Sequence, residues 1–197
     1  MKGYLEEYDT PVIKSKNVAV VGGGNVAMDA ARSAIRMGAE HVYIVYRRSQ
    51  DELPARKEEV YHAKEEGIEF MFLTNPVKIN GDENGRAESM ECIKMQLSEP
   101  DESGRKKSVP IKNSDFIIPV DTVIMSVGTS PNPLIRKTTT GIEVNNRGCL
   151  VVDEDMMTTR KGIYAGGDAV TGAATVILAM GAGRAAAASI DKYISEK

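Results

Sequence analysis

A glycine-rich turn between an apolar run and a helical stripe constrains this chain more than any other feature. Val18–Val21 is continuously apolar, as in a parallel strand that is covered on both faces. Gly22-Gly23-Gly24 follows, and Asn25–Met37 then carries apolar residues at helical spacing before Gly38. The segment predicts a strand, a tight turn and a helix that begins at the turn.

The next segments continue the alternation of strands and helices. The pattern predicts a strand over Val42–Tyr46, a helix over Pro54–Glu66 and a third strand over Ile68–Phe72. A βαβαβ order favours a Rossmann-like, three-layer, doubly wound parallel sheet with right-handed crossovers.

The pattern changes after residue 76. Short alternating stretches predict an antiparallel β-meander over residues 76–120; they are Val77–Ile79, Ser89–Leu97 and Phe116–Pro119. Charged, turn-rich segments separate them, including Pro100–Lys107. Asp121–Val127 then reads as a further parallel strand. After Gly128 we expect a crossover, a short strand at Leu150–Val152 and a closing helix over Thr175–Ile194.

The glycine turn fits the pattern G-x-G-x-x-A, with a strand before it and a helix after it. Gly22 permits the tight turn, and Gly24 has no side chain to block a pyrophosphate. The phosphates are expected at the positive end of the helix dipole. The predicted cofactor-binding residues are Gly22, Gly23, Gly24, Asn25 and Val26. The alternative to nucleotide binding is that the three glycines form an ordinary loop.

The end of the second strand indicates which nucleotide is bound. Sites for NAD usually place an acidic residue there, whereas this chain has Arg47-Arg48. Guanidinium groups bind a 2′-phosphate with charge-assisted hydrogen bonds, so NADP(H) is favoured over NAD(H). The alternative is a solvated basic pair that forms ion pairs with Asp51 and Glu52.

A second motif lies near the C-terminus. Thr158, four further residues and Ile163–Asp168 fit the pattern T-x-x-x-x-h-h-h-h-G-D of flavoproteins that bind two dinucleotides. Ser126-Val127-Gly128 fits the short motif that ends their NADP domain. The resemblance to such flavoproteins implies that FAD is lined by Gly167, Asp168, Ala174, Thr175 and Val176, with Gly128 as a further cofactor-binding residue.

These motifs together resemble the small (beta) subunit of NADPH-dependent glutamate synthase and related flavoprotein reductases. The shared segments are residues 20–29, 45–49, 52–56 and 166–176. The resemblance implies hydride transfer from NADPH to FAD, with electrons passing on to a large glutamate synthase subunit or another electron acceptor. It implies that Arg47 and Arg48 hold the 2′-phosphate. Glu59 falls near a carboxylate that related reductases direct at the nicotinamide, although a salt bridge on the helix surface explains it equally well.

The resemblance also implies parts that this sequence lacks. Such subunits carry iron–sulfur segments and a first glycine fingerprint for FAD. We therefore expect the C-terminal part of a larger protein, with a linker over residues 1–15, an NADP(H)-binding domain over 16–128 and a remnant of the FAD domain over 129–197. Alone, the chain is expected to bind little or no FAD and to be inactive, with iron–sulfur clusters only outside it.

Composition excludes several functions. A net charge of −3 gives no basic footprint for nucleic acid, and no apolar run reaches the ~20 residues of a membrane span. Cys92 and Cys149 stand alone, and His41 and His62 lack ligand-like neighbours, so no metal site is predicted and a cytoplasmic setting is expected. No nucleophile or general base is apparent, so no catalytic residue is assigned.

Three alternatives stay open. A disulfide reductase resembling thioredoxin reductase is disfavoured because neither cysteine belongs to a CxxC pair. The chain could instead be a nucleotide-binding module without turnover, or the NADP subunit of a ferredoxin-linked transhydrogenase. Its apolar C-terminal segment, with Ile177, Leu178 and Met180, is expected to fold back on the NADP domain, exchange between protomers or become buried in a homodimer.

Overall fold

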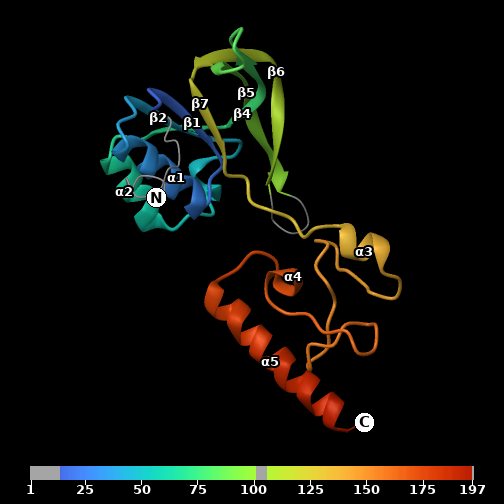
Figure 1. The fold of residues 1–197 in the computed structure, drawn as a ribbon. Coiled ribbons are helices and arrows are strands. Elements are labelled where there is room, and N and C mark those ends of the chain that lie inside the picture. Colours follow the sequence, from blue (N-terminus) through green and yellow to red (C-terminus); the bar gives the residue numbers. More distant parts are fainter. Residues whose placement is uncertain (1–13, 101–105, 197) are drawn as a thin grey trace. The chain divides into compact units, whose positions relative to one another are not determined.

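The computed structural model describes residues 14–100 and 106–196 (Figure 1). Its chain divides into two compact units, Met1–Val127 and Gly128–Lys197. Most of the linker predicted over residues 1–15 lies outside the described residues.

A four-stranded parallel sheet forms the centre of the first unit. Its strands are β1 (Asn17–Val21), β2 (His41–Tyr46), β3 (Glu69–Phe72) and β7 (Thr122–Met125), in the order β3-β2-β1-β7. The crossovers contain α1 (Asn25–Arg36) and α2 (Lys57–Glu65). The predicted βαβαβ order and the parallel sheet are confirmed.

The second crossover begins differently from the prediction. A 3₁₀ turn, η2 (Gln50–Glu52), comes first, and α2 starts at Lys57 rather than at Pro54. Leu53 is extended, with φ −62° and ψ 122°, because a residue before proline is sterically excluded from the helical region. Pro54 therefore delays the helix.

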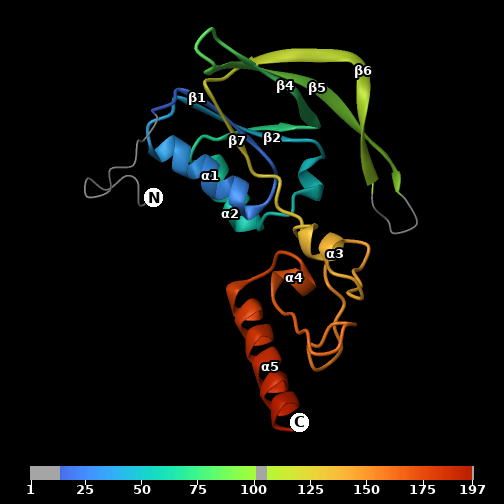
Figure 2. The same ribbon diagram turned by 45° about the vertical axis from the view of Figure 1, so that its right-hand side comes forward.

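Alternate side chains of β1 and β2 enter two different cores. Val18, Val20, Val42 and Ile44 pack with Ala27, Met28 and Ala31 of α1 and with Ala63 of α2. Ala19, Val21 and Val45 pack with Met90, Cys92 and Ile118 of the meander. The first unit thus has three layers, with both helices on one face of the parallel sheet and an antiparallel sheet on the other (Figure 2).

The antiparallel sheet has the order β4-β5-β6 and is the predicted meander. Its strands, β4 (Thr74–Gly81), β5 (Ala87–Pro100) and β6 (Lys106–Pro119), are much longer than the alternating stretches that predicted them. Pro100 pairs with Lys106, so β5 and β6 extend into the segment that we predicted as a loop. Most of β6 is exposed, which removes the apolar alternation by which a half-buried strand is recognised.

The second unit contains α3 (Leu134–Thr138), α4 (Asp168–Thr171) and α5 (Val176–Ser195). The closing helix lies within one residue of its predicted bounds. The predicted strand at residues 150–152 is reduced to isolated bridges, Val144 with Leu150 and Val152 with Thr158. Among the described residues, no helix combines the length and apolarity needed to cross a bilayer.

Candidate nucleotide-binding site

Gly22 makes the turn at the carboxyl end of β1. Its φ is 145°, and its N–H donates to Val45 O at 3.0 Å. A Cβ at this position would lie 2.3 Å from the main-chain oxygen of Ser126. Ser126 is held there because its own N–H donates to Val21 O at 2.8 Å. Only glycine fits between β1 and the end of β7.

Gly23 is crowded for a different reason. A Cβ would lie 2.7 Å from the Tyr46 ring and 2.8 Å from Leu53. The carbonyl of Gly23 accepts from Ala55 N at 3.1 Å, and the Tyr46 hydroxyl donates to Glu52 O at 2.7 Å. Gly23 therefore packs the turn against the segment that precedes α2.

Gly24 faces open space. It is the N-cap residue of α1, with φ −87°, and an added Cβ would meet no atom within 4 Å. The first N–H groups of any α-helix lack partners within the helix, and Asn25 and Val26 at the start of α1 are exposed. The turn thus presents helix N–H donors beside a position without a side chain, as an approaching phosphate requires.

The start of α2 is attached to the start of α1. The N–H of Arg56, the N-cap residue of α2, donates to Asn25 Oδ1 at 2.9 Å. Sequence reasoning did not assign Arg56 to the site. The signal that could have found it is its place directly before the second crossover helix, because the crossover helices of a parallel sheet begin at the same edge of the sheet, beyond the carboxyl ends of the strands.

Arg47 and Arg48 follow β2 and differ in their surroundings. Arg47 is exposed. Arg48 is half-buried, and its Nη2 donates to the main-chain oxygen of Lys106 at 3.1 Å. Its Nε is buried and has no hydrogen-bond partner among the described residues.

The sequence leaves open that Arg47 and Arg48 form ion pairs with Asp51 and Glu52, and the described part of the structure does not contain these pairs. Glu52 Oε2 instead accepts from Ser49 N at 3.0 Å and from Ser49 Oγ at 2.6 Å, forming a capping box on η2. These bonds, and more weakly the charges of Arg48 and Lys106, lower the pKa of Glu52. Within residues 14–100 and 106–196, no ion pair joins either arginine to Asp51 or Glu52.

Glu59 lies in a salt bridge. Its Oε2 is 2.7 Å from Arg32 Nη1, and Arg32 Nε also contacts Glu66 Oε1 at 2.9 Å. This ion-pair network joins α1 to α2. It matches the surface salt bridge that we considered for Glu59.

The second motif lies wholly within the second unit. Thr158 is buried, and its N–H donates to Ile163 O at 2.8 Å. Gly167 has φ 66°, and a Cβ there would lie 3.3 Å from Ala179 of α5. A Cβ at Gly166 would lie 3.1 Å from the main chain of Ala182, so both glycines let the motif approach α5 closely. Asp168 is exposed, and its Oδ1 accepts from Ala174 N at 3.3 Å.

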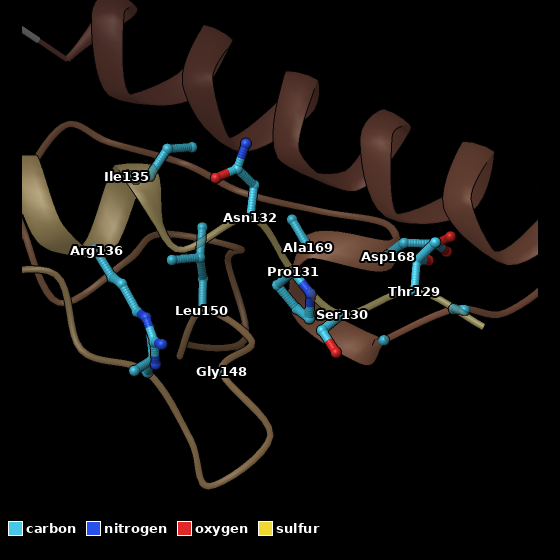
Figure 3. Close-up of a pocket in the computed structure, with 13 residues that line it drawn as sticks. Thr129, Ser130, Pro131, Asn132, Ile135, Arg136, Gly148, Leu150, Asp168 and Ala169 are labelled. Atoms are coloured by element: carbon cyan, nitrogen blue, oxygen red, sulfur yellow. The ribbon is translucent and has the colours of Figure 1, made fainter. Parts of the chain in front are cut away.

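Asp168 also lines a cavity of about 320 Å³ in the second unit. Figure 3 shows Asp168 and Arg136 at opposite ends of the lining, with Pro131 and Leu150 between them. The other predicted FAD residues lie elsewhere: Gly167 is buried, while Gly128, Ala174, Thr175 and Val176 are exposed. Thr175 Oγ1 caps α5 by accepting from Leu178 N at 3.4 Å.

The cysteines and histidines form no site in the described part of the chain. Cys92 and Cys149 are both buried, and burial raises the pKa of the Cys92 thiol to about 11. His41 Nδ1 lies 3.5 Å from Glu69 Oε1, and His62 packs edge-on against Tyr61. Residues 14–100 and 106–196 contain no group of three acidic, histidine or cysteine side chains that could hold a metal ion.

Known proteins that are similar in sequence to this chain include subunits of NADP-dependent and NADPH-dependent enzymes. The chain is 44% identical over 187 residues to the NADP(+)-dependent formate dehydrogenase subunit beta of Moorella thermoacetica, covering 94% of this chain and 26% of that protein. It is 34% identical over 200 residues to the glutamate synthase [NADPH] small chain of Escherichia coli (strain K12), covering 98% and 42% respectively. The resemblance to glutamate synthase small chains is confirmed, and the chain spans well under half the length of these relatives.

Solved structures show the same fold. The crystal structure of T. acidophilum thioredoxin reductase aligns with a TM-score of 0.71 at 26% identity, covering 96% of this chain and 54% of that one. The profile of the family described as "Pyridine nucleotide-disulphide oxidoreductase" matches residues 2–184. The chain therefore belongs to the pyridine nucleotide-disulphide oxidoreductase family.

Proposed function

We propose that this chain binds NADPH at the start of α1 and belongs to a flavoprotein that passes hydride from NADPH to FAD. The observation that carries the proposal is the open space at Gly24, beside the N-terminus of α1, in a turn whose other two glycines are crowded. Arg47 and Arg48 follow the adjacent strand and supply cationic groups for a 2′-phosphate.

Each residue has a definite task in this proposal. The N–H groups of Gly24, Asn25 and Val26 donate to the pyrophosphate, and the N-terminal dipole of α1 adds attraction for its charge. Gly22 and Gly23 hold the turn in shape. Arg47 and Arg48 select the phosphorylated ribose. With both cofactors bound, NADPH would supply hydride to the flavin, and the protein would align the two cofactors and exclude water.

The second unit contributes to FAD binding in the whole protein. Gly167 and Asp168 lie at the turn into α4, and Ala174, Thr175 and Val176 lead into α5, whose N-terminal dipole suits the flavin edge that becomes negative on reduction. We propose a cytoplasmic protein with iron–sulfur clusters outside this chain. Its partner is a large glutamate synthase subunit or another electron acceptor.

Calorimetric titration of the 197-residue chain with NADPH and NADH tests the nucleotide assignment. NADPH should bind at least about tenfold more tightly, because a 2′-phosphate forms charge-assisted bonds with the arginine pair. Replacing both Arg47 and Arg48 by Gln should remove the preference and leave NADH binding unchanged. Equal affinity of the wild-type chain for both nucleotides would overturn the proposal.

A nucleotide-binding module without turnover is the second candidate. It is favoured by the exposure of Ala174, Thr175 and Val176, three of the residues proposed to line FAD. Mixing the chain with NADPH, FAD and a dye acceptor separates the candidates. Dye reduction indicates a working flavin site in this chain, whereas NADPH binding without dye reduction indicates a module that needs the rest of the protein.

A further inference from the structure

The segment that would bind the 2′-phosphate carries no net charge of its own. Between residues 47 and 52, Arg47 and Arg48 are balanced by Asp51 and Glu52. A phosphate monoester carries roughly −1.5 to −2 charges at neutral pH. The segment therefore attracts such a group only weakly at long range, and a further cation beside it would make this part of the site positive.

Lys106, the first residue of β6, lies beside this segment. Its main-chain oxygen accepts from Arg48 Nη2 at 3.1 Å, which fixes the start of β6 against the arginine pair. Its side chain is exposed, and its charge is one of the causes that lower the pKa of Glu52, after the hydrogen bonds from Ser49 and the charge of Arg48. The hydrogen bond fixes the main chain of Lys106 beside Arg48, and the effect on Glu52 indicates that the Lys106 ammonium group lies within electrostatic range of that carboxylate.

Lys64 also reaches the segment, but in a different arrangement. Its Nζ donates to Gln50 Oε1 at 3.0 Å and lies 5.5 Å from the centre of the Phe70 ring. These contacts hold the Lys64 ammonium group between Gln50 of η2 and Phe70 of β3. Lys106 differs from Lys64 because its main chain is hydrogen-bonded directly to Arg48.

We propose that Lys106 is a third cationic residue of the 2′-phosphate subsite, so that the start of β6 helps to select NADPH over NADH. The proposal rests on the function proposed above. The exposed Lys106 side chain begins at the main-chain contact with Arg48, so its ammonium group can supply a donor to a phosphate that the arginine pair binds. A strand of the antiparallel sheet thereby becomes a specificity element of the parallel-sheet nucleotide site.

The chain contains a matched control at the next residue. Lys107 is exposed like Lys106, and its N–H donates to Ser98 Oγ at 3.0 Å. Successive side chains of a strand point to opposite faces, so the Lys107 side chain lies on the face of β6 opposite to that of Lys106. Replacement of either lysine by Gln removes the same charge from the start of the same strand.

The test compares the binding of 2′,5′-ADP and 5′-ADP to the full 197-residue chain by titration at low and moderate salt. Lys106→Gln should weaken 2′,5′-ADP binding on the order of fivefold, as expected for one partly exposed charge pair, and leave 5′-ADP binding unchanged. Lys107→Gln should leave both affinities unchanged. Lys106→Arg should retain the preference, and the main-chain bond to Arg48 persists in every variant.

The outcomes separate the two proposals. If the wild-type chain binds both probes equally, the NADP(H) assignment itself fails. If the wild-type chain prefers 2′,5′-ADP and Lys106→Gln keeps that preference in full, only the role of Lys106 is overturned. If Lys107→Gln weakens 2′,5′-ADP binding as much as Lys106→Gln, the effect is one of general charge, and the specific subsite is likewise overturned.

Discussion

The main-chain N–H of Arg56 donates to Asn25 Oδ1 at 2.9 Å, which joins the N-cap residue of α2 to the first residue of α1. The two helices therefore begin beside each other, at the carboxyl end of the parallel strands. Helix N-termini carry partial positive charge, so this contact brings two of them to the turn at Gly24. Asn25 thus has a positioning role in addition to any contact with a nucleotide.

Two replacements of Asn25 separate these roles. Asn25→Ala removes the acceptor for Arg56 N and should lower the free energy of unfolding by about 1 kcal/mol. Asn25→Asp keeps an acceptor but adds a negative charge at the start of α1, so stability should be retained while NADPH binding falls. Thermal unfolding and calorimetric titration measure the two effects. An Asp variant that binds NADPH as tightly as the wild-type chain would contradict a phosphate position at this helix start.

The three glycines of the turn should respond differently to a methyl group. Gly22→Ala places a Cβ 2.3 Å from Ser126 O at φ 145°, so the free energy of unfolding should fall on the order of 3 kcal/mol. Gly24→Ala meets no atom within 4 Å at φ −87°, so stability should change by no more than about 0.5 kcal/mol. NADPH affinity should nevertheless fall at least about tenfold in Gly24→Ala, because the methyl group fills the space that the phosphate needs. A Gly24→Ala chain with unchanged affinity would show that the nucleotide lies elsewhere.

Much of this architecture could be predicted because local signals and packing agree. The apolar run of β1 predicts a strand, the glycines after it predict a turn, and the apolar stripe that follows predicts a helix. These three signals are mutually consistent, so the predicted bounds of β1 and α1 agree with the structure within a residue or two. The length of β5 and β6 could not be predicted in the same way. Their outer parts carry charged and polar residues, and pairing between the two strands, rather than burial, defines them.

The candidate site was predictable only in part for a related reason. Sequence spacing identifies residues next to the turn, such as Gly24 and Asn25, but not residues that a distant strand brings there. Lys106 reaches Arg48 through the pairing of β5 with β6, a contact between residues 58 positions apart. No local pattern in the sequence encodes it.

The reactivity of the two cysteines tests whether the chain could act as a disulfide reductase. Cys92 and Cys149 are buried, and burial raises the pKa of Cys92 to about 11, so little thiolate forms at pH 8. The native chain should therefore release almost no thionitrobenzoate from Ellman's reagent within minutes, whereas the chain unfolded in guanidinium chloride should show both thiols. Rapid reaction of a native thiol would restore the disulfide reductase as a candidate.

The first turns of α5 should promote self-association. Val176, Ile177 and Leu178 are 75%, 81% and 61% exposed, which is unusual for neighbouring apolar side chains. Sedimentation equilibrium should show a mass that rises with concentration, and Ile177→Glu should shift the chain towards the monomer. Ile117→Glu, at a 65% exposed position on β6, is the control and should leave the association unchanged. A wild-type chain that stays monomeric at all concentrations would contradict the homodimer expected for this segment.

The ion-pair network between α1 and α2 should make stability depend on pH. Glu66 contacts Arg36 Nη2 at 2.5 Å and Arg32 Nε at 2.9 Å, and these bonds, Arg36 first, lower its pKa from the ordinary value of 4.5. A carboxyl group whose folded-state pKa is lowered stabilises the fold above its unfolded-state pKa, and this stabilisation is lost as the pH falls through the lowered value.

Glu66→Gln should accordingly reduce the Tm at pH 7 and flatten the decline in Tm between about pH 5 and pH 3. Glu65→Gln is the matched control, because Glu65 is the exposed neighbour and takes part in no ion pair among the described residues. Its profile should follow that of the wild-type chain. If Glu66→Gln and Glu65→Gln give the same pH profile, the pairing of Glu66 with the two arginines does not stabilise the contact between α1 and α2.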